Sequence, residues 1–192
     1  MDRYTSFAEL ACVELAGRDY TVRGREHPGS RLLLIAPHGG RIENGTSELA
    51  TLIAGADHSL FCFEGRKLTG TNRDLHLTSH RFDHPQCLTM LARARIACAI
   101  HGCRGQGQVF VGGLDGDLGE LIARRLRAAG VRASASGHAY PGTHPHNICN
   151  RGVSGAGVQL ELTSDLRSAR ARARLAPLLR AALREYLSTC VA

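Results

Sequence analysis

Two short apolar runs each lead into a histidine that is followed by a glycine. Residues 32–35 pass through an Ala-Pro dipeptide to His38 and two glycines, and residues 96–100 pass directly to His101. Runs of this length and composition are typical of buried strands. Open sheets of parallel strands bind ligands beyond the carboxyl ends of those strands, so the sequence predicts that both imidazoles reach one place.

A carboxylate follows the first histidine at short range. Glu43 lies five positions after His38, and Gly39 and Gly40 between them allow the chain to turn back tightly. Catalytic zinc takes three nitrogen or oxygen ligands from the protein and keeps a fourth position open for water. His38, Glu43 and His101 supply such a set, so we expect them to bind one zinc ion.

Predicted strands and helices alternate along most of the chain. The residue pattern predicts strands at 20–25, 31–36, 59–64, 75–79, 96–100, 109–112 and 158–162, and helices at 6–16, 46–54, 86–95, 115–129 and 165–187, the last bent or broken near Pro177. This order indicates an α/β fold whose open, mixed, mostly parallel sheet is flanked by helices. The 192 residues, 43% of them hydrophobic, fit one domain spanning 1–192.

The last third of the chain carries further candidates for chemistry. Residues 137–157 are rich in Gly, His and Asn and are too long for a plain connection, which favours a functional loop. In the strand that follows, alternation places Gln159 and Glu161 on one face. Glu161 is therefore a candidate general base.

The charge balance is basic. Lys and Arg number 24 against 17 Asp and Glu, a net charge of +7, which favours an anionic partner such as a polyanionic substrate or a nucleic acid. Four tyrosines, five phenylalanines and no tryptophan offer little for stacking on bases, so the composition disfavours nucleic acid.

Cysteine use and the N-terminus bear on location. The seven cysteines include no C-x-x-C pair, which favours free thiols and a reducing compartment. The first residues lack the basic and apolar regions of a signal peptide, and no apolar run is long enough to cross a membrane. We expect a cytoplasmic monomer that makes no membrane contact.

Ordered motifs give the chain a family resemblance. They are YTSFAEL from Tyr4, APHGGRIENGTSELA from Ala36, FEG from Phe63, LHLTSHRFDHP from Leu75, AIHGC from Ala99, GGLD from Gly112, NICNRG from Asn147 and GVQLEL from Gly157. Together they resemble the poly-gamma-glutamate hydrolases, first recognised as phage enzymes, and the match runs through most of the chain.

The resemblance implies a fold like that of the zinc carboxypeptidases and zinc-dependent hydrolysis of gamma-glutamyl amide bonds in poly-gamma-glutamate. His38, Glu43 and His101 match the metal positions, and Glu161 matches the expected base. The spacing departs from the tighter His-x-x-Glu of the metallocarboxypeptidases, so that comparison holds at the level of the fold. A phage-encoded copy would reach an outer polymer through lysis.

Such a substrate presents one free alpha-carboxylate per residue and needs cationic or amide contacts. Asn150 and Arg151 are the first candidates, because a guanidinium binds a carboxylate with two hydrogen bonds and an amide can share the contact. Asn147, Arg41 and His80 are second choices.

Several of these residues also have structural interpretations. Glu43 could cap the helix predicted to begin at Thr46, and Glu161 could be the buried partner of Arg167.

Other pairs carry weaker signals. His76 and His80 lie four apart, as in a zinc pair on a helix, but the predicted strand at 75–79 disfavours a second metal site. Cys103 and Cys149 stand near histidines, as a thiol nucleophile needs, but no spacing singles out either.

Two other functions stay open beside the hydrolase of poly-gamma-glutamate. One is a zinc amidohydrolase for another acidic amide, and the other is a basic protein that binds anions or nucleic acid and has lost the chemistry. The presence of His38, Glu43, His101 and Glu161 together favours an enzyme, because a binding protein would be expected to lose at least one of them.

Overall fold

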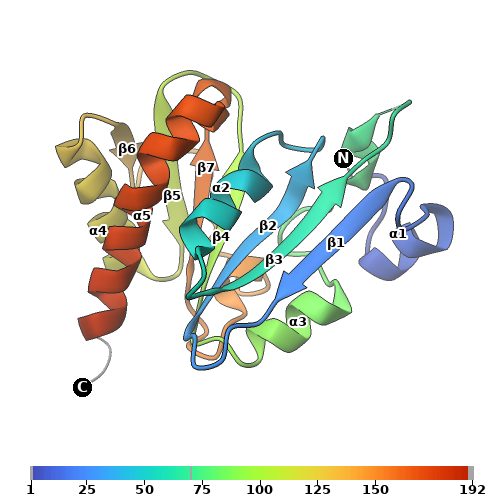
Figure 1. Cartoon of the computed structure of the whole chain (residues 1–192), viewed down its shortest axis with the longest axis horizontal. Helices are drawn as coiled ribbons and strands as arrows, with labels where there is room; N and C mark the ends of the chain where they lie inside the picture. Colours follow the sequence, from blue (N-terminus) through green and yellow to red (C-terminus); the bar gives the residue numbers. More distant parts are fainter. Residues whose placement is uncertain (1, 70, 190–192) are drawn as a thin grey trace.

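The computed structural model describes residues 2–69 and 71–189 (Figure 1). A seven-stranded sheet with the order β1-β3-β2-β4-β7-β5-β6 runs through these residues. Its strands are β1 (Tyr20–Arg25), β2 (Leu32–Gly40), β3 (Ser59–Gly65), β4 (Ile96–Gly102), β5 (Gln108–Gly113), β6 (Arg132–Ser134) and β7 (Val158–Leu162). Strands β3, β2, β4 and β7 are parallel to one another, as are β5 and β6, whereas β1 pairs antiparallel with β3 and β5 with β7. The predicted mixed, mostly parallel sheet is confirmed.

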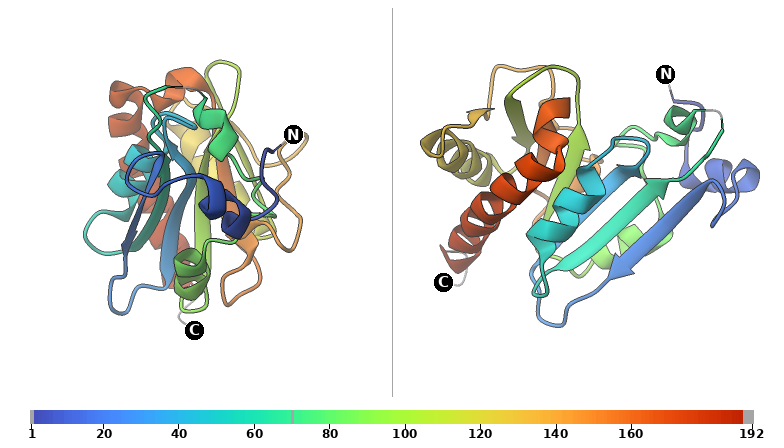
Figure 2. Two further views of the ribbon diagram at one scale, coloured as in Figure 1. Left: turned by 90° about the vertical axis from the view of Figure 1, so that its right-hand side faces the viewer. Right: turned by 45° about the horizontal axis from the view of Figure 1, so that its top comes forward.

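Helices cover both faces of this sheet (Figures 1 and 2). They are α1 (Phe7–Val13), α2 (Thr46–Ala54), α3 (Pro85–Leu91), α4 (Gly116–Ala128) and α5 (Ala169–Thr189). In β2, Leu32 and Leu34 belong to the core shared with α2, α4 and α5, while Leu33 and Ile35 belong to the core shared with α1 and α3. An unbroken apolar run is what a strand covered on both faces requires.

The carboxyl ends of three strands meet at one edge of the sheet. Strand β4 lies between β2 and β7 and runs parallel to both, so the residues that end these strands come close together. The register pairs His101 at the end of β4 with Glu161 on β7. This edge therefore brings the predicted base beside a predicted metal ligand.

A glycine turn directs the chain after β2 back over that edge. Gly40 has φ +62°, and a Cβ there would lie 2.5 Å from the carbonyl oxygen of Gly65, so any larger residue would clash. Beyond the turn, the backbone N–H of Glu43 donates to the carbonyl of His38 at 2.9 Å. The turn thus returns the Glu43 side chain to the histidine that precedes it.

The predicted strand at 75–79 is wrong. The segment begins as the end of a 3-10 turn and pairs with no strand of the described sheet. Its backbone groups bind side chains instead: the N–H of Thr78 donates to Asp2 at 2.7 Å, and the carbonyl of Leu77 contacts the ring of His38 at 2.7 Å. Alternation of Leu and polar residues here reflects burial against the end of the sheet.

Other boundaries differ less. The predicted helix at 165–187 is divided into a 3-10 turn at Ser164–Arg167 and α5, which continues through Pro177 without a break. Strand β6 was not predicted, because three residues are too few for a pattern. Further 3-10 turns lie at Asn72–Leu75 and Ile148–Asn150.

Arginines of α5 hold the helix to the rest of the protein. Arg180 and Arg184 donate to the two carboxylate oxygens of Asp57 at 2.6 and 2.7 Å, and Arg180 also donates to the carbonyl of Ile53. These contacts tie α5 to the end of α2. They give these two arginines a structural use.

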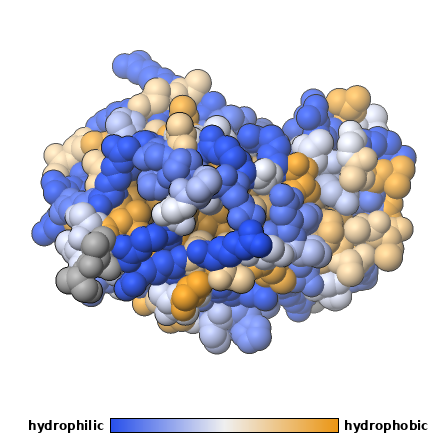
Figure 3. All heavy atoms as spheres, turned by 60° about the horizontal axis from the view of Figure 1, so that its bottom comes forward, coloured by the Kyte–Doolittle hydropathy of each residue, from blue (hydrophilic) through white to orange (hydrophobic). Residues whose placement is uncertain are grey.

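The helices, the surface and the thiols add three further observations. No helix in the described ranges is both long and apolar enough to cross a bilayer. On the side of the molecule that Figure 3 brings forward, hydrophilic side chains are interspersed with smaller hydrophobic areas. The six described cysteines are free thiols, as predicted, and Cys190 lies outside the described residues, as do positions 1, 70, 191 and 192 of the predicted domain.

Candidate metal centre

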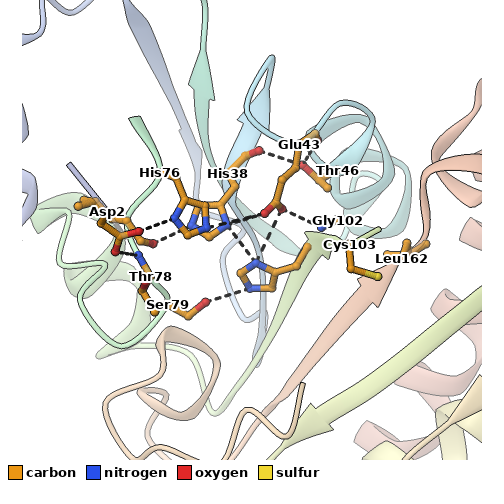
Figure 4. Close-up of polar contacts among 12 residues, drawn as sticks. Asp2, His38, Glu43, Thr46, His76, Thr78, Ser79, Gly102, Cys103 and Leu162 are labelled. Carbon is orange, nitrogen blue, oxygen red and sulfur yellow. Dashed lines mark hydrogen bonds and ion pairs between the residues drawn. The ribbon is translucent and has the colours of Figure 1, made fainter. Parts of the chain in front are cut away.

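His38 lies at the end of β2, and both of its ring nitrogens have partners. Its side chain is 2% exposed, and Nε2 lies 2.7 Å from the carbonyl oxygen of Leu77. A carbonyl only accepts, so Nε2 carries the proton and donates. Burial disfavours the charged ring, but Glu43, whose Oε1 lies 3.1 Å from Nδ1, outweighs burial and raises the pKa of His38 (Figure 4).

His76 reaches the same place from the segment after the first 3-10 turn. Its Nδ1 lies 2.8 Å from Oδ1 of Asp2, which leaves Nε2 on the side of Glu43, 4.0 Å from Oε1. The rings of His38 and His76 are stacked, with centroids 4.0 Å apart. Ligand atoms of His38, Glu43 and His76 all lie within 4.8 Å of one another.

His101, the predicted third ligand, adjoins this group. Its side chain is 2% exposed, with Nδ1 lying 3.2 Å from Nδ1 of His38 and 3.9 Å from Oε2 of Glu43. Burial, together with the charge of His38, lowers the pKa of His101 to about 3, so the ring stays neutral. The structure therefore brings the three predicted ligands together and adds a third imidazole, that of His76. Which of them bind metal stays a prediction.

Glu43 is held as a carboxylate. Burial alone would raise its pKa, but His38 and His101 and the N–H of Gly102, which donates to Oε2 at 2.7 Å, lower the pKa to about 2. Helix α2 begins after Gly45, and no side chain caps its first turn. Glu43 therefore faces the histidines, and the alternative of a helix cap is not what the structure shows.

Glu161 experiences the opposite environment. Burial raises its pKa, the nearby charge of Glu43 raises it further, and the result is a pKa of about 7 despite the opposing charges of His38 and Arg167. The alternative partner, Arg167, donates to the carbonyls of Leu162 and Asn44 at 3.2 and 2.8 Å. A carboxylate with such a pKa can accept and return a proton near neutral pH.

A cavity of about 400 Å³ joins these groups. His38, Glu43, His76, His101 and Glu161 all line it, as does the 139–144 part of the predicted functional loop. The arrangement provides nitrogen and oxygen donors for a divalent cation beside a carboxylate of raised pKa, with room for a ligand between them.

Two of the predicted substrate contacts lie in this cavity. His80 lines it with its ring centroid 4.9 Å from that of His144. Asn147 lines it as well, and its Nδ2 donates to Oε1 of Gln159 at 2.8 Å, which fixes the amide.

The other three predicted contacts do not line this cavity. Asn150 donates to the carbonyls of Gly142 and His144 and accepts from two backbone N–H groups, so its amide holds the loop together. Arg151 donates to the carbonyl of Phe82 at 3.5 Å, and Arg41 donates to that of Lys67 at 2.9 Å. A role for these three in binding substrate stays a prediction.

The alternative of a cysteine nucleophile finds no support in the described thiols. Burial, reinforced by the charge of Glu161, raises the pKa of Cys103 to about 11, and burial also raises the pKa of Cys149. A nucleophilic cysteine needs a lowered pKa.

Sequence reasoning missed His76 and Asp2 as parts of the site. The two histidines of the LHLTSH motif were the available signal for His76, but the expected strand directed attention away from it. Asp2 meets His76 across 74 positions of sequence, and no local pattern marks that contact.

A family model described as poly-gamma-glutamate hydrolase matches residues 4–174. The chain belongs to the poly-gamma-glutamate hydrolase family. This confirms the resemblance drawn from the motifs and the class of enzyme that it implied. Hydrolysis of poly-gamma-glutamate breaks gamma-glutamyl amide bonds, which is the reaction that the resemblance predicted.

Individual relatives in Bacillus subtilis are similar in sequence over most of this chain. YmaC of Bacillus subtilis (strain 168) is 36% identical over 171 residues, covering 88% of this chain and 72% of the relative. In the same organism, the prophage-derived YoqZ is 35% identical and YndL is 36% identical. The chain spans 60% of the length of YoqZ and 66% of that of YndL.

Solved structures extend the likeness to the fold. A bacteriophage poly-gamma-glutamate hydrolase superposes with a TM-score of 0.93 at 30% identity, covering 98% of this chain and all of the other. Zinc-free YndL gives 0.86 at 32% identity, with both chains fully covered. A metallo-carboxypeptidase from Burkholderia cenocepacia gives 0.52 at 13% identity, covering 91% of this chain and 64% of the other, which confirms the carboxypeptidase-like fold.

Proposed function

We propose that this chain hydrolyses gamma-glutamyl amide bonds of poly-gamma-glutamate with one zinc ion held by His38, Glu43 and His76. The observation that carries the proposal is that His38 and His76 each have one ring nitrogen bound by an oxygen of the protein, on the side of the ring away from Glu43. His38 donates from Nε2 to the Leu77 carbonyl, and His76 is bound at Nδ1 by Asp2. Metal-binding histidines nearly always donate their second ring N–H to a carbonyl or carboxylate.

His101 is the alternative third ligand. Its 3.2 Å separation from Nδ1 of His38 suits two nitrogens on one ion, since zinc–nitrogen bonds are about 2.0–2.1 Å long. However, the other ring nitrogen of His101 faces only the hydroxyl of Ser79, at 3.4 Å. This contact is longer than the 2.8 Å contact between His76 and Asp2. The difference favours His76 as the ligand and His101 as a neutral neighbour.

The donor set fits zinc in particular. Two imidazole nitrogens and one carboxylate oxygen are a common set for catalytic zinc, and they leave a position open. A relative whose structure is named zinc-free supports the same ion. When bound, zinc polarises the amide carbonyl and lowers the pKa of a coordinated water.

Glu161 does the proton transfer in this proposal. In its ionised form a carboxylate oxygen of Glu161 accepts a proton from the attacking water, and in its protonated form it donates that proton to the nitrogen of the leaving amine. A pKa of about 7 makes both forms accessible near neutral pH. The fixed amide of Asn147 and the ring of His80 can contact substrate carboxylates in the cavity.

Elemental analysis and a polymer-size assay test the proposal on wild type and on single alanine variants of His38, His76 and His101. Wild type should bind one zinc per chain and shorten poly-gamma-glutamate. His38→Ala and His76→Ala should lose zinc, while His101→Ala should keep it. Loss of zinc in His101→Ala, with zinc retained in His76→Ala, would assign the third ligand to His101. Zinc-free wild type that still cleaves the polymer would contradict a zinc enzyme.

A further inference from the structure

A second cavity, of about 520 Å³, opens on the other side of the candidate metal centre. Glu43, His76 and Thr78 line both this cavity and the one that contains Glu161. The two cavities therefore meet at the candidate metal ligands, and a chain held across that point would extend into both.

The two cavities differ in charge. Among the described residues, no arginine or lysine lines the cavity of Glu161, whereas Arg73, Arg104 and Arg167 line the second one. Arg167 is occupied by carbonyl oxygens of the protein, at Leu162 and Asn44. Arg73 and Arg104 are exposed, and neither guanidinium has a carboxylate partner among the ion pairs of the described residues.

Carboxylates near these two arginines are already bound elsewhere. Asp2 accepts from the N–H of Thr78 and contacts His76, and Glu43 accepts from Gly102 and contacts His38. The neighbouring Asp74 pairs with Arg3 at 2.9 Å. Two guanidinium groups thus remain available to an anionic ligand in a cavity that ends at the metal centre.

We propose that Arg73 and Arg104 form a binding subsite for the alpha-carboxylates of a gamma-linked glutamate chain on one side of the bond that is cleaved. The inference rests on the proposed function and deepens it. A guanidinium binds a carboxylate with two parallel hydrogen bonds, and a polymer with one carboxylate per unit suits two such groups. With chain held on both sides of the metal centre, cleavage is internal rather than confined to the polymer ends.

The test compares Arg73→Gln/Arg104→Gln with wild type and with Arg124→Gln. Arg124 is exposed on α4 and lines neither cavity, so its replacement controls for the loss of one of the two positive charges that the double variant lacks. The first readout is binding of a fluorescein-labelled gamma-glutamate oligomer to metal-free protein. The double variant should bind at least about tenfold more weakly and with less dependence on salt, since it loses two charge-assisted hydrogen-bonding groups. Arg124→Gln should bind as wild type does.

The second readout is the size distribution of polymer early in digestion by zinc-loaded wild type. Fragments of intermediate size should form before monomers or dimers. Equal oligomer binding by all three proteins, or release of only terminal units from the start, would overturn the subsite. If wild type binds the oligomer through these arginines but zinc-loaded protein cleaves no gamma-glutamyl bond, the proposed function fails while the anion site stands.

Discussion

Glu43 and Glu161 are partly buried carboxylates at the same edge of the sheet, yet their surroundings move their pKa values in opposite directions. Glu43 lies among imidazoles and a backbone N–H, and its pKa falls to about 2. Glu161 lies on β7, where burial and the charge of Glu43 raise its pKa to about 7. Environment, rather than residue type, therefore separates the proposed metal ligand from the proposed proton carrier.

Replacing the proton carrier should have the largest effect. Glu161→Gln keeps the size of the side chain but can no longer accept a proton, so kcat should fall by about 10²–10⁴, the usual contribution of general acid–base catalysis. Steady-state kinetics on poly-gamma-glutamate measure this. Glu120→Gln, at an exposed carboxylate on α4, is the control for the loss of one negative charge. A kcat for Glu161→Gln within threefold of wild type would contradict the assignment.

The affinity for zinc can be lowered without replacing a proposed ligand. Asp2→Asn keeps a hydrogen-bond acceptor beside Nδ1 of His76 but removes the charge, so zinc affinity should fall about 10–100-fold. Competition with a chelator gives the dissociation constant. Arg3→Gln, next in sequence and exposed, is the control and should leave zinc affinity unchanged. Unchanged affinity in Asp2→Asn would remove Asp2 from the centre.

The two carboxylates should also give opposite slopes of stability against pH in metal-free protein. Glu161 has a folded pKa raised from 4.5 to about 7, so the folded state loses stability as pH rises through that window. Glu43 has a folded pKa lowered from 4.5 to about 2, so its contribution is present above pH 4.5 and is lost as pH falls toward 2.

Urea unfolding at several pH values tests these slopes. Each unit between folded and unfolded pKa corresponds to about 1.4 kcal/mol in the free energy of unfolding. Glu161→Gln should flatten the curve between pH 4.5 and 7, and Glu43→Gln should flatten it below pH 4.5. If the two variants gave identical curves of unfolding free energy against pH, the surroundings would not move the pKa values of Glu43 and Glu161 in opposite directions.

The smallest effect is expected far from the site. Asp57 accepts from Arg180 and Arg184, and these hydrogen bonds lower its pKa. Because the groups are partly exposed, Asp57→Asn should lower the free energy of unfolding by only about 0.5–1 kcal/mol at neutral pH, with zinc affinity and kcat unchanged. A change in kcat would show that α5 is coupled to the site.

Sequence patterns predicted the site residues that lie on strands of the sheet. The apolar runs of β2 and β4 and the alternation in β7 are local signals, and parallel order then placed His38, His101 and Glu161 at one edge. The tight turn after β2 was visible in its glycines, and Glu43 follows from it.

The rest depends on contacts that local patterns do not encode. His76 sits in a segment whose alternation imitates a strand, and Asp2 comes to it from the far end of the chain. Asn150 and Arg151 were the predicted carboxylate contacts, but their side chains bind backbone carbonyls. Arg73 and Arg104, which line the second cavity, lie just outside the motifs.

Zinc stoichiometry of Glu43→Gln and Glu161→Gln, measured side by side with polymer cleavage, tests the central claim most directly. The account predicts that Glu161→Gln binds one zinc per chain, as wild type does, but leaves poly-gamma-glutamate intact, whereas Glu43→Gln binds little zinc and is inactive for that reason. Full zinc in Glu43→Gln, or cleavage of the polymer by Glu161→Gln at the wild-type rate, would contradict it.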